Sequence, residues 1–145
     1  MERRRCKLKD NNFCIAHIDG ASRGNPGIAA IGIHITDQTG TVIKTHNEYI
    51  GITTNNVAEY TAAIKALEII KKLGFNSVEL YSDSELLVKQ LKGEYKVKHE
   101  TLIPLHTQIK FLIKNLASFK ITHVFRENNK EADKLANVAL DAIIK

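Results

Sequence analysis

The stretch FCIAHIDGASRGNPGIAAIGIHIT (residues 13–36) sets the fold, because two apolar, β-branched runs flank a glycine-rich segment. FCIAHID (13–19) and IAAIGIHIT (28–36) are predicted to be strands, and DGASRGNPG (19–27) is predicted to be a tight loop between them. Another strand is expected over TVIKTHNEYI (41–50), after the turn residues DQTG. Three successive strands with short connections predict an antiparallel meander.

Helical spacing of apolar residues replaces strand spacing beyond the third strand. It runs from 56 to 73, and Gly74 ends it. After this crossover, SVELYSD (77–83) is expected to be a strand that pairs in parallel. The remaining predicted elements are a helix over 84–93, a helix over 101–116, a strand over 119–125 and a helix over 129–144. The order β-β-β-α-β-α-α-β-α predicts an α/β fold with a five-stranded mixed sheet and helices on both faces.

Composition predicts one globular domain, because 145 residues with 43% hydrophobic side chains can form one core. We assign that domain to 13–145, after a short basic extension over 1–12. The net charge of +5 favours a polyanionic partner such as nucleic acid. No apolar run approaches the roughly 20 residues that span a bilayer, and the N-terminus lacks a secretory pattern. We therefore expect a cytoplasmic monomer without a membrane partner, in which Cys6 and Cys14 are free thiols.

Four acidic residues occupy informative places in this layout. Asp19 ends the first strand, Glu59 is placed in the first turn of the long helix, Asp83 ends the fourth strand, and Asp133 lies early in the last helix. Taken alone, Asp83 is first interpreted as a helix cap, because it precedes SELLV. If the first and fourth strands are neighbours, however, the carboxylates converge, and their repulsion calls for a divalent cation. Oxygen ligands favour Mg²⁺ or Mn²⁺ over zinc, and two such ions about 4 Å apart can promote in-line displacement at phosphorus.

Neutral polar residues accompany the acids. The glycines of DGASRGNPG (19–27) let backbone groups approach a ligand closely, although glycine-rich turns are common. TTNNVAE (53–59) sets four Thr and Asn residues at the start of the long helix, where N–H groups favour phosphate. A cap needs one such residue, so the excess favours a nucleic-acid contact.

The segments DGASRGNPG, TTNNVAE, YSDS and KEADKLAN, in this order and spacing, resemble the ribonuclease H type 1 family over residues 13–142. The resemblance implies a ribonuclease H-like fold. It also implies an endoribonuclease that cleaves the RNA strand of RNA/DNA hybrids and leaves 5′-phosphate and 3′-hydroxyl ends. The same resemblance implies that Asp19, Glu59, Asp83 and Asp133 are catalytic and hold two Mg²⁺ ions, with Mn²⁺ as a substitute. Glu59 is further implied to contact the ribose 2′-hydroxyl, the group that distinguishes RNA from DNA.

The resemblance also implies a set of substrate-binding residues in the first loop and at the start of the long helix. They are Gly20, Ser22, Gly24, Asn25, Thr54, Asn55 and Asn56. These neutral groups are expected to carry specificity for the hybrid, while basic residues mainly contribute affinity.

One departure from the family pattern is the missing histidine before the last helix. Many members have a mobile-loop histidine there, whereas FRENNKEAD (125–133) contains none. His123 falls within a predicted strand and is interpreted as structural. Arg126, Glu127 or Asn129 are candidates to take over part of the missing role.

A second departure is the missing basic protrusion, for which GEYKVKHET (93–101) leaves no room. Lysines nearby are expected either to form a smaller basic edge or to be a solvated surface. They are Lys89, Lys92, Lys96 and Lys98.

Three alternatives stay open. The chain could be a non-catalytic nucleic-acid-binding module on the same fold, although no carboxylate of the set is missing. It could cleave double-stranded RNA as well as hybrids. It could also carry out an exonuclease or integrase reaction with similar acids, against which the TTNN segment argues.

Overall fold

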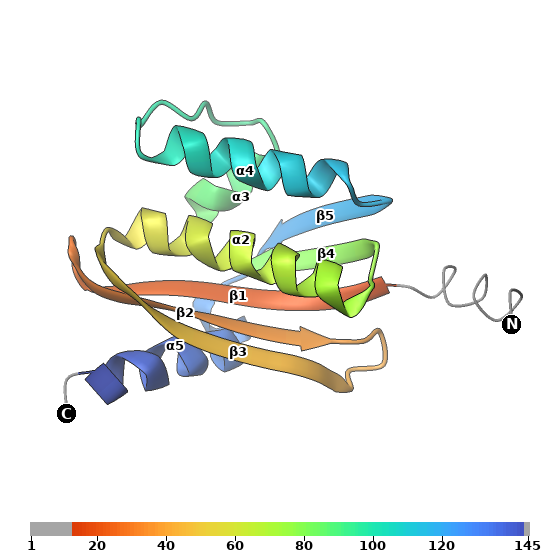
Figure 1. Ribbon diagram of the computed structural model, residues 1–145, viewed down its shortest axis with the longest axis horizontal. Coiled ribbons are helices and arrows are strands. Elements are labelled where there is room, and N and C mark those ends of the chain that lie inside the picture. The colour runs from red at the N-terminus through yellow and green to blue at the C-terminus, as the bar shows by residue number, and fades with distance from the viewer. Residues whose placement is uncertain (1–12, 144–145) are drawn as a thin grey trace, which may run out of the picture.

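The computed structural model describes residues 13–143 (Figure 1). Its elements are β1 (Phe13–Gly24), β2 (Gly27–Thr36), β3 (Val42–Thr53), α2 (Asn55–Leu73), β4 (Ser77–Ser82), α3 (Glu85–Leu91), α4 (Leu102–Lys114), β5 (Ser118–His123), the 3₁₀ turn η1 (Arg126–Asn128) and α5 (Lys130–Ile143). The predicted order of strands and α-helices is confirmed, and η1 is an addition to it. Within the described residues, no helix is both long and apolar enough to cross a membrane. The predicted extension over 1–12 lies outside the described residues.

The five strands form one mixed sheet in the order β3-β2-β1-β4-β5. The first three strands pair antiparallel, whereas β4 is parallel to both β1 and β5. The parallel pairing of β1 with β4 follows from the long connection through α2, because adjacent parallel strands need a crossover. The predicted fold class is therefore confirmed, and β1 lies at the centre of the sheet.

Helices cover both faces of the sheet (Figure 1). Helices α2, α3 and α4 lie on one face, and α5 lies on the other. Buried Ile18, Leu67 and Ile70 belong to the main core, which lies on the α2 side. On the opposite side α5 approaches β2 closely, since a Cβ added to Gly32 would lie 2.1 Å from the Ala132 carbonyl oxygen. The absence of a side chain at this position lets α5 pack directly on the strand.

Helix α2 begins and ends where its capping residues dictate. The Thr54 side chain accepts a hydrogen bond from the Val57 N–H at 3.2 Å, which satisfies one of the free donors of the first turn. Gly74 adopts a left-handed conformation with φ of 92° and ends the helix, as predicted. The cap at Thr54 makes the helix begin at Asn55, one residue before the predicted start.

The predicted loop over 19–27 is wrong. Strand β1 continues to Gly24 and β2 begins at Gly27, so the connection is only Asn25 and Pro26. The small residues of this segment permit continued pairing, with Ala21 opposite Ala30 in the ladder. Three other strands end at residues different from the predicted ones. Strand β3 ends at Thr53 instead of 50, β4 at Ser82 instead of 83, and β5 at His123 instead of 125.

Cys14 is a free, fully buried thiol on β1. Burial raises its pKa to about 12, so the neutral thiol predominates and the side chain packs as a small apolar group. Cys6 lies outside the described residues.

Candidate active site

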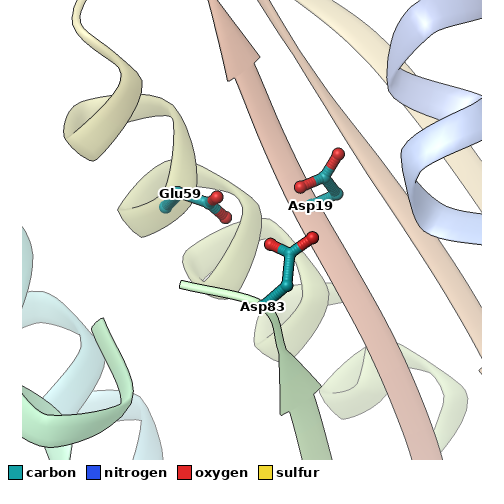
Figure 2. Close-up of side chains that lie close together, drawn as sticks. All are labelled: Asp19, Glu59 and Asp83. Atoms are coloured by element: carbon teal, nitrogen blue, oxygen red, sulfur yellow. The ribbon is translucent and has the colours of Figure 1, made fainter. Parts of the chain in front are cut away.

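Three acidic side chains converge at the centre of the sheet (Figure 2). Asp19 comes from β1, Glu59 from α2, and Asp83 follows β4 directly. One carboxylate oxygen from each lies within 4.8 Å of the others. Asp19 and Asp83 approach each other because Ile18 is opposite Ser82 in the parallel register, and the next residue after each of these is an aspartate. The predicted convergence of these three acids is confirmed.

Glu59 is fixed by the backbone of the neighbouring strand. Its Oε1 accepts a hydrogen bond from the Gly20 N–H at 3.0 Å. A Cβ added to Gly20 would lie 2.3 Å from the Ala58 carbonyl carbon, so glycine lets α2 come this close. The prediction that Glu59 lies in the first turn is wrong. Because Thr54 caps the helix, the first turn contains no acid and Glu59 lies in the second.

The protonation of this cluster is strongly perturbed. Burial, followed by the charge of Asp83 and the hydrogen bond and charge of Asp133, raises the pKa of Asp19 to about 8. Burial also raises the pKa of Glu59 well above its ordinary value, and the charges of Asp19 and Asp83 add to this rise. The hydrogen bond from Gly20 opposes it. Such a cluster favours either protons or a cation, since ionised carboxylates at this separation repel one another.

Asp133 lies beside these three acids and not among them. It is in the first turn of α5, as predicted, and it is close enough to Asp19 to contribute to the raised pKa of that residue. Asn137 donates to its Oδ1 at 3.2 Å. The Arg126 Nη2 lies 3.6 Å from the same oxygen. The fourth acid thus connects the cluster to the charged groups of α5 and η1.

Asp83 is not the cap of α3. Ser84 occupies that position, and its Oγ accepts a hydrogen bond from the Leu87 N–H at 3.2 Å. The capping explanation for Asp83 is therefore wrong, and its carboxylate faces the other acids (Figure 2).

The acids line a cleft of ≈ 540 Å³. Its walls are residues 20–23 of β1, residues 123–126 around the end of β5, and Asn55, Ser84, Asn137 and Leu140. A cleft with clustered acids and exposed polar groups is chemically suited to a metal ion and a polar substrate.

Comparison with known proteins agrees with this geometry. A family model described as reverse transcriptase-like matches residues 17–139. Ribonuclease HI of Halobacterium salinarum (strain ATCC 700922 / JCM 11081 / NRC-1) is 43% identical over 126 residues, which cover 87% of this chain and 63% of that protein. The crystal structure of RNase H1 from Halobacterium salinarum NRC-1 has a TM-score of 0.88 and 42% identity, covering 90% of this chain and 98% of the crystallised one. This chain belongs to the ribonuclease HI family.

A further ribonuclease H1 structure resembles this chain equally well. The crystal structure of LC11-RNase H1 in complex with an RNA/DNA hybrid has a TM-score of 0.87 and 42% identity, and the match covers 91% of this chain and 99% of the other. By contrast, this chain spans less than two thirds of the full Halobacterium sequence.

Three of the substrate-binding residues that the ribonuclease H resemblance implies lie in the cleft. Gly20, Ser22 and Asn55 contribute to its lining. The Ser22 Oγ donates to the Thr53 carbonyl at 3.0 Å and also contacts the Gly24 carbonyl. This hydroxyl therefore links the end of β1 to the end of β3, next to the start of α2.

The other four implied residues lie outside the cleft lining. Asn25 accepts a hydrogen bond from the Asn55 N–H at 3.1 Å, which joins the β1–β2 turn to the start of α2. Thr54 caps that helix, Gly24 has a φ of 107° beside the turn, and Asn56 is exposed. Their contact with substrate stays a prediction.

Several cleft residues were missed by sequence reasoning. Arg23 pairs with Asp141 at 2.8 Å and donates to the Asn137 Oδ1 at 3.1 Å. Phe125 is 67% exposed and stacks edge-on against His123, with ring centroids 5.6 Å apart. His123 was interpreted as structural, yet it ends β5 and lines the cleft. Adjacent parallel strands bring their carboxyl ends together, so knowing that β5 neighbours β4 would have placed His123 beside Asp83.

The lysines of the predicted basic edge do not line the acidic cleft. Lys89 lies 3.6 Å from Glu85 and 5.1 Å from the centroid of the Tyr95 ring. Lys92, Lys96 and Lys98 are exposed. The binding role of these residues stays a prediction.

Proposed function

We propose that this chain is an endoribonuclease that hydrolyses the RNA strand of RNA/DNA hybrids and leaves 5′-phosphate and 3′-hydroxyl ends. The observation that carries the proposal is the convergence of Asp19, Glu59 and Asp83 within 4.8 Å at the cleft. Membership of the ribonuclease HI family supports it, and so does the close similarity to a ribonuclease H1 crystallised with a hybrid.

The acidic cluster fits a hard divalent cation. Its donors are all carboxylate oxygens. Burial, followed by the negative charges of the neighbouring acids, raises the pKa values of Asp19 and Glu59, and a bound cation would relieve both effects. We propose that Asp19, Glu59, Asp83 and Asp133 hold two Mg²⁺ ions, and that Mn²⁺ can replace them. When bound, such ions supply positive charge that activates a water and stabilises the leaving oxygen.

The chain's own residues orient the reacting groups. The Gly20 N–H holds the Glu59 carboxylate in place, where it can contact a ribose 2′-hydroxyl and so select RNA. Ser22 and Asn55 line the cleft next to Gly20, and these residues are proposed to follow the RNA strand. Gly24, Asn25, Thr54 and Asn56 are proposed to bind the hybrid beside the cleft. Their neutral polar groups position the duplex backbone.

Cleavage of three labelled RNAs tests the activity and its specificity together. The RNA/DNA hybrid, double-stranded RNA and single-stranded RNA are each incubated with the protein and Mg²⁺, and the products are separated on one gel. We expect cleavage of the hybrid alone, with cleavage abolished in Asp19→Asn and in Asp83→Asn. Glu94→Gln, which neutralises an exposed carboxylate, is the matched control and should keep full activity.

Each alternative has its own outcome in that experiment. Unchanged cleavage in both aspartate variants would contradict the catalytic assignment. Absence of cleavage of any substrate by the wild-type protein would favour a non-catalytic binding module. Equal cleavage of double-stranded RNA would contradict the specificity assigned to Glu59.

We also propose that the protein acts as a monomer in the cytoplasm. The acids that line the cleft all belong to this chain, so the proposed chemistry requires no residue from a second copy. Light scattering coupled to size-exclusion chromatography tests this, and a mass twice that of the chain would contradict it. Fractionation of source cells tests the compartment.

A further inference from the structure

A second, smaller cavity lies beside β1 and the start of α5, apart from the acidic cleft. Its volume is ≈ 240 Å³. Strand residues His17, His34 and Thr36 line one side, and the segment from Glu127 to Glu131 lines the other. None of these residues lines the acidic cleft, so this is a separate site.

Two histidines face each other across the strands of this cavity. His17 on β1 is directly opposite His34 on β2 in the antiparallel register. Directly opposed residues have Cβ atoms roughly 4.5–5.5 Å apart. The His17 ring stacks on Tyr81, with centroids 4.9 Å apart and planes at 18°, which restricts its orientation. Within residues 13–143, neither imidazole forms a hydrogen bond or ion pair.

Asn129 supplies an independent indication that something binds here. The residue is only 1% exposed, and its Nδ2 donates to the Ile18 carbonyl at 2.8 Å. Its Oδ1 is buried and has no hydrogen-bond partner in the described part of the chain. Buried polar atoms are nearly always satisfied by protein, water or a bound group. The unsatisfied Asn129 Oδ1 therefore indicates that a hydrogen-bond donor or a cation binds in this cavity.

The remaining lining groups favour a cation. Glu127 and Glu131 are exposed carboxylates without an ion-pair partner among residues 13–143. Lys130 carries the single positive charge of the lining. The two carboxylates and the Asn129 oxygen would repel an anion. Two imidazoles with oxygen donors form the mixed ligand set that suits zinc-class ions better than Mg²⁺.

We propose that this cavity binds a divalent transition-metal ion of the Zn²⁺ class through His17 and His34. Glu131 provides a third ligand, and Asn129 lies at the remaining side of the ion. Their ligand atoms do not already converge within 4.8 Å as those of the acidic cluster do. Binding therefore requires rotation of side chains within this set, of which Glu131 is exposed. The ion would join β1 and β2 to the start of α5.

Zn²⁺ titration by calorimetry tests this site independently of hydrolysis. The full chain carries Asp19→Asn and Asp83→Asn to disable the acidic cluster, and Cys6→Ser to remove a competing thiol. We expect one Zn²⁺ per chain, a raised thermal midpoint with Zn²⁺, and no displacement by an equal concentration of Mg²⁺. His34→Gln and, separately, His17→Gln should each weaken binding at least tenfold.

His99→Gln removes an exposed imidazole elsewhere and is the matched control, which should bind as tightly as its parent. His34→Gln keeps the test valid if His17→Gln fails to fold, as judged by circular dichroism. Absence of Zn²⁺ binding would overturn the proposal. Equal affinity in the His34 variant, or displacement of Zn²⁺ by Mg²⁺, would overturn it as well.

Discussion

The backbone N–H of Gly20 donates to the Oε1 of Glu59 at 3.0 Å, which joins the residue after Asp19 to the helix that carries Glu59. This hydrogen bond fixes the distance between β1 and α2, and so it positions both Asp19 and Glu59. The same bond lowers the pKa of Glu59, whereas burial and the neighbouring acids raise it more strongly. The geometry of this site is therefore set by the close packing of β1 against α2 at Gly20, and not by mutual attraction among its charged groups.

Gly20→Ala should damage both folding and catalysis. The added Cβ would lie 2.3 Å from Ala58 and 2.4 Å from the Glu59 nitrogen, which forces β1 and α2 apart. We expect a loss of about 1–3 kcal/mol in the free energy of unfolding and a large fall in kcat, measured by urea denaturation and hybrid cleavage. Gly40→Ala is the control: its φ of 93° makes alanine strained there although no atom lies within 4 Å of the added Cβ, but residue 40 does not line the cleft, so kcat should be unchanged. Equal effects of the two substitutions on kcat would contradict the role of this contact.

Stability should fall with rising pH when metal is removed by chelator. The pKa of Asp19 is about 8 in the folded protein against an ordinary value of 3.8, so the folded state binds more protons between these values. The free energy of unfolding therefore decreases from about pH 4 to about pH 8. Asp19→Asn should be more stable than wild type near pH 8 and similar near pH 4.

The difference in the free energy of unfolding between the two proteins is limited by the change in the proton affinity of Asp19 on folding. Each tenfold change in that affinity corresponds to about 1.4 kcal/mol. Thermal unfolding of both proteins across this pH range provides the measurement. Added Mg²⁺ should restore wild-type stability at the alkaline end. A wild-type protein more stable than Asp19→Asn at pH 8 in chelator would refute the assigned burial cost.

Asp133→Asn should impair cleavage less than Asp19→Asn. Asp133 lies beside the three converging acids, and an amide oxygen at this position can still accept from Asn137. Asparagine can also still offer an oxygen to the metal that Asp133 is proposed to hold, so we expect a loss of about 10- to 100-fold in activity, whereas Asp19→Asn should reduce cleavage to background. Asp133→Ala should be worse than Asp133→Asn, because it removes every side-chain oxygen at this position and leaves Asn137 only the backbone carbonyl of residue 133 as acceptor. Steady-state cleavage of a labelled hybrid measures all three, and equal loss in the two asparagine variants would argue against this order.

Asn129→Ala should destabilise the protein by about 1–2 kcal/mol, since the buried Ile18 carbonyl loses its side-chain donor. The neighbouring Asn128 is exposed, so Asn128→Ala provides a matched control with little effect. Urea denaturation of both variants distinguishes them. The same destabilisation in both would mean that the bond to β1 contributes nothing.

Much of the fold followed from the periodicity of the sequence, because strands and helices here have clean apolar patterns. Helix 56–73 differs from α2 by one residue, and Gly74 ends it as predicted. The hairpin was misjudged because Gly20, Ser22 and Gly24 suggest a loop by composition. Pairing with β2 overrides that local preference.

The acidic site was predictable in part. Asp19 and Asp83 converge because both follow strands that pair in parallel, and the order of elements indicated that pairing. Side-chain orientation was not predictable. The place of His123 depends on which strand β5 joins, and the alignment of Arg23 with Asp141 depends on how α5 lies across β2. Such tertiary contacts leave no periodic pattern in the sequence.

The parallel pairing of Phe13 with Ser77 has a consequence for synthesis of the chain. Strand β1 leaves the ribosome before its partner β4, which follows only after β2, β3 and α2 have been made. Asp83 cannot approach Asp19 before then, and Asp133 arrives later still, with α5. Asp19 therefore lacks the complete set of partner carboxylates while the chain between β1 and α5 is being made, and the acidic site cannot assemble until α5 has docked on the sheet.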